Sequence, residues 1–325
     1  MEPGDFVLGV DVGGTKILIG CIENNGTVFK QKKYPMNRAT QESSLHSIFA
    51  AIDDFMKEKP AAKAPLAMGI GLVGHVNNDG GEWLNAINIP INEVVPLSDI
   101  LSKKYGIPVF LDNDVHAATL AEMRLGAGQK YKDFVYVNIG TGISVGIVCN
   151  GRLVRGCDNY AGEFGHMIVE FNGELCKCGR KGCLETISSG GGMVTAAKTM
   201  LDKFEHSVLN RLEKEGKLTA TTIFEMANAG DELSLIISER ALNGVCISMV
   251  NLINLLNPEM IVLGGGVLKG GWLLERIMNH INVYTLPVSR KALKGIAPTI
   301  LSVDSAGMIG ASCIAWNSLE QQGLY

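Results

Sequence analysis

The chain has 325 residues, 46% of them hydrophobic and 19% charged, a composition typical of a globular protein with room for two domains. The formal net charge of −4 gives no electrostatic reason to expect nucleic acid or an anionic membrane as a partner. The first residues lack the pattern of a signal peptide, and the longest apolar run, 245–256, is too short to span a bilayer, so we expect a cytoplasmic protein.

The first part of the chain alternates strands, glycine turns and helices. The predicted strands are 6–12, 16–23, 66–74 and 108–114, and the predicted helices are 45–58, ended by Pro60, and 94–106. The stretch GIGLVG (69–74) matches a dinucleotide-binding fingerprint, which requires a helix to begin at the turn. The following residues, HVNNDGGEW, indicate turn and loop instead, so we reject that interpretation. No P-loop pattern is present either.

The second part repeats the style of the first. A helix is predicted at 115–126, closed by Gly126, and strands follow at 134–140 and 144–156. Residues 188–257 are predicted to be largely helical, 260–267 a strand, and 305–317 a closing helix. Both halves open with a strand, a glycine turn and a strand, which indicates an internal duplication with a ligand cleft between two α/β halves.

Three glycine-rich turns follow predicted strands and are candidates for binding a nucleotide. In the first, backbone N–H groups and short side chains can face a phosphate without Cβ obstruction, and Asp11 is placed to hold Mg²⁺, with water between them. A plain hairpin turn is the alternative for this segment alone, but the other two turns favour a nucleotide cleft. The candidate residues are Asp11, Gly13, Gly14, Thr15, Lys16, Thr141, Gly142, Gly265 and Gly266.

Six motifs together resemble the ROK family of sugar kinases and related repressors, over about residues 6–317. In order they are DVGGTK (11–16), LDNDVHAATLAE (111–122), IGTG (139–142), GEFGH (162–166), CKCGRKGCLE (176–185) and IVLGGGV (261–267). The resemblance implies an actin/hexokinase-type (ribonuclease H-like) ATPase fold with two α/β domains around a central cleft. We expect one domain from 1–115 plus 305–325, to which the last helix returns, and a larger one from 116–304.

Four side chains in the spacing H-x9-C-x-C-x4-C are suited to tetrahedral Zn²⁺, and in the family the matching residues are zinc ligands. They are His166, Cys176, Cys178 and Cys183. Merely buried thiols are a poor alternative, because the intervening residues are basic, and eight cysteines in this length do not make a disulfide framework. Four protein ligands leave no position for water, so we expect a structural zinc.

The resemblance also implies a sugar site and a catalytic base. Residues matching Asn113, Glu163, His166 and Glu185 contact sugar hydroxyls in the family, and we place Gly74 with them. Asp114 matches the catalytic base, although from local sequence alone a helix N-cap is preferred. The helix N-terminus should hold Asp114 ionised. His166 could serve both sites, with one ring nitrogen on zinc and the other towards sugar.

The sequence therefore predicts ATP-dependent phosphorylation of a hexose at its 6-hydroxyl, with glucose as the first candidate. Kinases for N-acetylmannosamine, fructose, allose or a β-glucoside remain alternatives. A sugar-responsive repressor is disfavoured, because the phosphate turn begins at Asp11 and leaves no room for a preceding helix-turn-helix. An actin-like assembly protein would need neither the predicted zinc site nor the carboxylates predicted to face the sugar. Ser144, Val145 and His116 depart from residues frequent in relatives. Relatives are commonly dimers or tetramers, so we expect a homo-oligomer.

Overall fold

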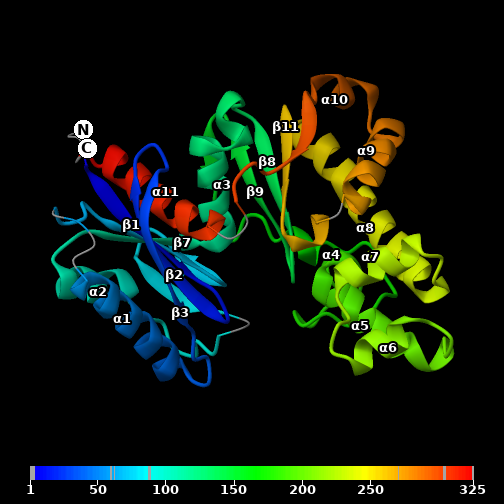
Figure 1. Ribbon diagram of the computed structural model, residues 1–325. Helices are drawn as coiled ribbons and strands as arrows, with labels where there is room; N and C mark the ends of the chain where they lie inside the picture. Colours follow the sequence, from blue (N-terminus) through cyan, green and yellow to red (C-terminus); the bar gives the residue numbers. More distant parts are fainter. Residues whose placement is uncertain are drawn as a thin grey trace. The chain divides into compact units, whose positions relative to one another are not determined.

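The structure is a computed structural model that describes residues 4–58, 61, 63–86, 89–269, 271–302 and 305–323. The chain forms two compact units (Figure 1). Unit 1 comprises Met1–Lys130, Gly151–Ala161 and Ile300–Tyr325, and unit 2 comprises Tyr131–Asn150 and Gly162–Thr299. The expected division at residues 115/116 and 304/305 stays a prediction about domains.

A mixed five-stranded sheet of order β3-β2-β1-β4-β7 forms the centre of unit 1. Its strands are β1 (Phe6–Val12), β2 (Lys16–Glu23), β3 (Val28–Pro35), β4 (Met68–Leu72) and β7 (Val109–Asn113). β1, β2 and β3 pair antiparallel, whereas β1, β4 and β7 are parallel. Unit 1 also contains β5 (His75–Asn77), β6 (Glu82–Asn85) and β10 (Arg152–Val154).

Helices cover both faces of this sheet (Figure 1). They are α1 (Gln41–Lys57), α2 (Leu97–Tyr105), α3 (Asp114–Leu125), η1 (Ala127–Lys130) and α11 (Ala306–Gln321). Alternate residues of β1, such as Leu8 and Val10, pack with apolar residues of α1 and α2 in one buried cluster. Val7, on the opposite face, packs with residues of α11. The central strands β1 and β4 are therefore buried on both sides, as their almost unbroken apolar sequences require.

Two strand glycines allow α11 to lie directly on the sheet. A Cβ atom on Gly9 would lie 2.2 Å from the carbonyl oxygen of Met308, and one on Gly69 would lie 1.9 Å from that of Ala311. Gly69 belongs to the stretch that imitates a dinucleotide-binding fingerprint. Its absent side chain is thus explained by helix packing.

Unit 2 repeats the strand order of unit 1. Its strands are β8 (Phe134–Ile139), β9 (Ile143–Cys149), β11 (Met260–Gly264) and β12 (Gly295–Pro298). The sheet has the order β10-β9-β8-β11-β12, and its edge strand β10 is the one that belongs to the segment 151–161 of unit 1. In each sheet the order is third, second, first, fourth and fifth strand, with an antiparallel first hairpin and parallel later strands. The internal duplication predicted from the sequence is therefore present in the topology.

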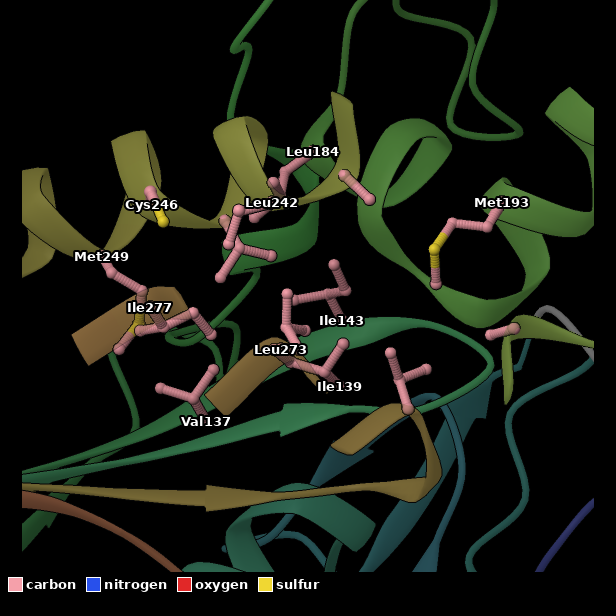
Figure 2. Packing of buried hydrophobic residues seen from close by; sticks show 14 of the residues in the cluster. Val137, Ile139, Ile143, Leu184, Met193, Leu242, Cys246, Met249, Leu273 and Ile277 are labelled. Atoms are coloured by element: carbon pink, nitrogen blue, oxygen red, sulfur yellow. The ribbon is translucent and has the colours of Figure 1, made fainter. Parts of the chain in front are cut away.

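The helical part of unit 2 lies mainly between β9 and β11 in the chain. Its elements are η2 (Phe164–His166), α4 (Leu184–Ser188), α5 (Gly190–Met200), η3 (Leu201–Lys203), α6 (Leu209–Lys214), α7 (Ala220–Asn228), α8 (Glu232–Leu256), η4 (Gly266–Leu268), α9 (Trp272–Tyr284) and α10 (Pro287–Ala292). Figure 2 shows their core, in which Leu242 of α8 and Leu273 of α9 face Ile139 and Ile143 of the sheet.

One described helix, α8, is long and apolar enough to cross a membrane by length and composition alone. It is longer than the apolar run 245–256 considered from the sequence. However, 61% of its most apolar window is buried inside the protein, and its residues Leu242 and Met249 belong to the core of unit 2 (Figure 2). Its apolar character therefore reflects packing within the unit.

Several local predictions were wrong or incomplete. The residues after GIGLVG form the β5–β6 hairpin instead of loop, although no helix begins there, as we argued. Helix α1 begins at Gln41 instead of residue 45, because Thr40 and Ser43 form a capping box. Pro60, the expected helix end, lies outside the described residues. The sequence did not predict β3, β12, α9 or α10.

Candidate functional site

In unit 1, the candidate residues lie at the edge where the parallel strands end. Asp11 of β1, Gly71 of β4 and Asp112 of β7 are register partners across three strands. Asp11 also lies against the first turn of α11, where a Cβ atom on Gly307 would lie 2.5 Å from an oxygen of its carboxylate. Carboxyl ends of parallel strands beside a helix start are a common place for ligands in α/β proteins.

The first of the three glycine-rich turns, at residues 13–15, is a tight loop between β1 and β2. The N–H group of Gly13 donates a hydrogen bond to the carbonyl oxygen of Lys16 at 3.0 Å. Thr15, at the tip, is exposed, and its carbonyl oxygen accepts from Met36 at 3.3 Å. The side chain of Thr15 is therefore open to solvent on a backbone that is fixed from both sides.

Asn113 links two of the residues placed in the sugar site. Its side-chain nitrogen donates to the carbonyl oxygen of Gly74 at 2.8 Å, and its side-chain oxygen accepts from the N–H group of Val115 at 2.8 Å. Asn113 is thus the N-cap of α3, the role that local sequence had suggested for Asp114. An amide has two N–H donors and two oxygen lone pairs, so Asn113 retains one of each for a ligand.

Asp114 opens α3, and its protonation differs from the sequence expectation. Burial and, after it, the charge of the neighbouring Asp11 carboxylate together raise the pKa of Asp114 to about 7, against the hydrogen bond from the N–H group of Val115. Burial likewise raises the pKa of Asp11 to about 6, against the charge of Lys16. The prediction that the helix N-terminus holds Asp114 ionised was wrong, because desolvation and a like charge outweigh the helix dipole. A carboxyl group with a pKa near neutrality is suited to general-base catalysis.

The two carboxyl groups also fit a divalent cation. Asp11 and Asp114 are partly buried and interact as like charges, and hard oxygen ligands of this kind are the ones that Mg²⁺ prefers. A cation beside Asp11 would offset the repulsion that helps to raise the pKa of Asp114. Asp11 remains our candidate for this ion.

In unit 2, the four predicted zinc ligands come together in the segment 166–183, here called the knuckle. Ligand atoms of His166, Cys176, Cys178 and Cys183 all lie within 4.8 Å of one another. The Sγ atoms of Cys178 and Cys183 are 3.6 Å apart, and Sγ of Cys176 lies 3.7 Å from Nδ1 of His166. Two sulfurs bound to a tetrahedral zinc at about 2.3 Å would be about 3.8 Å apart. The donor set and its spacing therefore fit a four-coordinate zinc.

The backbone of the knuckle is built around glycines and tied to helix α8. Gly182 has a φ of +76°, and a Cβ atom there would lie 1.6 Å from the carbonyl oxygen of Glu170. Arg240 of α8 donates two hydrogen bonds to the Glu170 carboxylate and two to that of Glu174, at 2.6 to 3.1 Å. These bidentate pairs hold the knuckle against α8.

One knuckle thiol has thiolate character. Desolvation alone would raise the pKa of Cys178, but hydrogen bonds from the backbone and side chain of Arg180 lower it to about 6. A metal ligand must be deprotonated to bind. Burial and the hydrogen bond with Cys178 raise the pKa of Cys183 to about 12, so the two neighbouring thiols favour a single thiolate, on Cys178.

Two carboxylates predicted to bind sugar lie directly before and after the zinc ligands in the sequence. Oε2 of Glu163 lies 3.6 Å from Nε2 of His166, whereas Nδ1 faces Cys176. That one ring nitrogen binds zinc and the other faces sugar stays a prediction. Glu185 follows Cys183 in the first turn of α4. Its Oε2 accepts a hydrogen bond from the N–H group of Ile143 at 3.0 Å. Glu185 thus connects the knuckle to the glycine turn at residues 140–142.

That turn meets a second glycine cluster that the sequence analysis missed. The N–H groups of Gly190 and Gly191 donate to the carbonyl oxygens of Gly140 and Thr141, at 2.8 and 3.2 Å. They belong to the start of α5, which is capped by Ser189. Three consecutive glycines at 190–192 were the available signal, because a run of glycines at a helix start indicates close backbone approach.

The third glycine turn lies beside the same segment of unit 2. Gly265 has a φ of +98°, and a Cβ atom there would lie 2.2 Å from the carbonyl oxygen of Ile139. Gly266, next to it, is exposed and has no atom within 4 Å of its Cβ position. Backbone with few side chains is therefore brought together from three segments, which are the turn at 140–141, Gly265 and the start of α5.

The chain was compared with known protein families and structures. The model described as the ROK family matches residues 7–318. A glucokinase of Halalkalibacterium halodurans is 34% identical over 97% of this chain and 97% of its own length. A ROK family glucokinase from Streptomyces griseus, solved with glucose and AMPPNP, has a TM-score of 0.74 at 29% identity, covering 94% of this chain and 98% of that chain.

A transcriptional regulator is also similar. A ROK family regulator described as a homologue of the Escherichia coli MLC protein has a TM-score of 0.85 at 28% identity, covering 97% of this chain and 78% of that chain. The family thus includes kinases and regulators with one architecture. The expected family and fold class are confirmed: the chain belongs to the ROK family and has its mixed α/β, hexokinase-like fold of the actin-like ATPase class.

Proposed function

We propose that this protein is an ATP-dependent sugar kinase that transfers a phosphoryl group to the 6-hydroxyl of a hexose, with glucose as the first candidate. The observation that carries the proposal is the pair of carboxyl groups, Asp11 and Asp114, at one edge of the sheet of unit 1, with a pKa near 7 for Asp114. The similarity to glucokinases over nearly the whole chain supports it.

In this proposal Asp114 orients the sugar hydroxyl and accepts its proton as the bond to the γ-phosphorus forms and the bond to ADP breaks. Positioning matters more than basicity in a loose phosphoryl-transfer transition state, and general-base assistance contributes a factor of about 10² to 10⁴. Asn113, which keeps one donor and one acceptor, would hold another hydroxyl. Glu163, His166, Glu185 and Gly74 complete the proposed sugar ligands.

The nucleotide is proposed to bind to the glycine turns, with Mg²⁺ held from Asp11. In unit 1 the proposed contacts are Thr15 and Lys16. In unit 2 they are Thr141, Gly142, Gly265 and Gly266. The backbone at these positions is exposed or half-buried and is accessible to phosphates or a nucleoside. The zinc would stabilise the knuckle and thereby fix Glu163 and Glu185. With four protein ligands it keeps no open coordination position for chemistry.

A pocket distinguishes isomeric hexoses by a few hydroxyl contacts, so N-acetylmannosamine, fructose, allose and a β-glucoside remain candidates. A sugar-responsive regulator is a second candidate function, because a regulator has a TM-score of 0.85 against this chain. Such a protein would bind sugar without turning ATP over.

The test is ADP formation with a panel of hexoses, for the wild type and for Asp114→Asn. We expect one preferred aldohexose, and a fall in kcat of about 10² to 10⁴ in the variant with sugar affinity largely retained. Asp99→Asn serves as the control, because this residue lies on α2 with a side chain that is 73% exposed.

Three outcomes would contradict parts of the proposal. Near wild-type turnover by Asp114→Asn would remove the base assignment. Equal ADP formation with and without sugar would favour an assembly ATPase. Sugar binding without any ADP formation would favour the regulator.

A further inference from the structure

A fully buried carboxylate directly precedes the two residues proposed to act on the sugar. Asp112 has no exposed side-chain surface and lies at the end of β7. Its Oδ1 accepts from the N–H group of Asn113 at 2.9 Å and lies 2.9 Å from Nδ1 of His116. Its Oδ2 accepts from Nε and Nη2 of Arg155, at 3.2 and 2.6 Å.

These contacts hold Asp112 as a carboxylate. Burial alone would raise its pKa, but His116 and Arg155 hold the pKa below its usual value. A buried charge of this kind is expensive unless it is paired and hydrogen-bonded. Here both oxygens are engaged, one by the start of α3 and the other by a guanidinium group from a distant segment.

Arg155 belongs to the segment 151–161, which is anchored to the strand ends of unit 1 at several points. Nδ2 of Asn159 donates to the carbonyl oxygen of Val76 at 2.8 Å, and Nε2 of His116 lies 3.4 Å from the carbonyl oxygen of Ala161. The side chain of Arg155 remains 31% exposed. A change at this residue would therefore alter the pairing of Asp112 without opening an internal cavity.

The carboxylate of Asp112 bridges the first turn of α3. It contacts the backbone before Asp114, through Asn113, and a side chain two residues after it, His116. Rotation of this carboxylate would therefore move the backbone that carries Asp114 and Asn113. A misplacement of about 1 Å can cost about 10²-fold in rate.

We propose that Arg155, acting through Asp112, is a positioning residue that sets the geometry of Asn113 and Asp114 for phosphoryl transfer. The inference rests on the proposed kinase function. The competing explanation is an ion pair that contributes to stability alone, as many buried pairs do. The two explanations differ in whether the effect of Arg155 depends on the presence of the Asp114 carboxylate.

The experiment measures kcat, the dissociation constant for the sugar and the melting temperature of Arg155→Lys in two backgrounds, wild type and Asp114→Asn. Lysine keeps the charge but supplies one point donor instead of the two-pronged contact. Arg152→Lys is the matched control, since Arg152 is an exposed arginine of the same segment. All variants are compared at a temperature where each is folded.

We expect Arg155→Lys to lower kcat roughly 10- to 100-fold in the wild-type background, and less than about twofold in the Asp114→Asn background, because the group to be positioned is gone. Arg152→Lys should match its parent in both. Equal fractional losses in the two backgrounds, or a wild-type kcat in Arg155→Lys, would overturn the inference. A wild type that forms no sugar-dependent ADP would instead remove the proposed function, and this inference with it.

Discussion

At the scale of single residues, the chemistry of the candidate site depends on how two carboxyl groups share one edge of a sheet. Asp114 is both partly buried and close to Asp11, and both effects favour its neutral form. The sequence identifies the residue but indicates the wrong direction for its pKa, because a helix start is visible in the sequence and burial against another strand is not.

The pKa of Asp114 makes the stability of the protein depend on pH. Between pH 4 and 7 the folded protein holds a proton on Asp114, whose pKa is about 7, whereas the unfolded chain, with a pKa of 3.8, has released it. Folding therefore takes up a proton, and this contribution to stability is lost as the pH rises through that window. At about 1.4 kcal/mol per pKa unit, the loss is at most about 4 kcal/mol, and less because the group is only partly buried.

The measurement is urea unfolding at pH 5 and pH 8, in buffer without magnesium or nucleotide. We expect the wild type to lose stability relative to Asp114→Asn between these pH values. In Asp11→Asn the loss should be smaller, because removal of the Asp11 charge lowers the pKa of Asp114. Asp99→Asn should behave like the wild type. A constant difference between the wild type and Asp114→Asn would contradict the assigned pKa.

At the scale of elements, the metal knuckle should support the glycine turn as well as the sugar ligands. Cys183 directly precedes α4, and Glu185 in the first turn of that helix accepts from the N–H group of Ile143. We expect about one zinc per chain, and we expect Cys178→Ser to lose the metal and to melt at a lower temperature. It should also bind the ATP analogue AMPPNP more weakly, because Glu185 is no longer held.

Metal analysis and calorimetric titration test this expectation, with Cys157→Ser as the control, since Cys157 is an exposed cysteine outside the knuckle. Loss of zinc with unchanged AMPPNP affinity would show that the turn does not depend on the knuckle.

A second element-scale prediction concerns the glycines of β4. At Gly69 a Cβ atom would lie 1.9 Å from the carbonyl oxygen of Ala311, whereas at Gly71 the nearest atom would be 3.5 Å away, in ordinary contact with Ala117. Gly69→Ala must push α11 off the sheet, so we expect a loss of roughly 1 to 3 kcal/mol or more. Gly71→Ala should lie within about 1 kcal/mol of the wild type. The measurement is the melting temperature of each variant, which should be clearly lower for Gly69→Ala than for Gly71→Ala. Similar melting temperatures would contradict the proposed close contact between Gly69 and α11.

The strands and glycine turns differ in how far the sequence could predict them. Apolar runs and glycine turns predicted β1, β2 and β8 to within about one residue, because a strand buried on both faces is apolar throughout. The strand predicted at 144–156 was too long, since β9 ends at Cys149 and a turn separates it from β10. Strand β3 was missed, since its sequence VFKQKKYP is rich in lysine and contains no apolar run, and all of its residues are half-buried or exposed. The residues 190–192 were missed because their partner, the turn at 140–141, is 50 residues away in the sequence.

At the scale of the whole molecule, the duplicated topology gives each unit its own hydrophobic core. One buried cluster gathers residues of β1, β4, β7, α1 and α2, and another gathers residues of β8, β9, β11 and the helices of unit 2 (Figure 2). Both units are discontinuous in the sequence, because the chain passes between them after residues 130, 150, 161 and 299. The sequence predicted the duplication from its repeated strand–turn–strand pattern.

Two separate cores should unfold in two steps, since proteins with more than one core often depart from two-state behaviour. We expect differential scanning calorimetry of the ligand-free protein to show two overlapping transitions. Gly69→Ala should lower only the transition of unit 1, because its contact with α11 lies in that unit. Removal of zinc, or Cys178→Ser, should lower only the transition of unit 2. A single transition whose midpoint shifts in both variants would contradict this prediction, because it would mean that the two units unfold cooperatively.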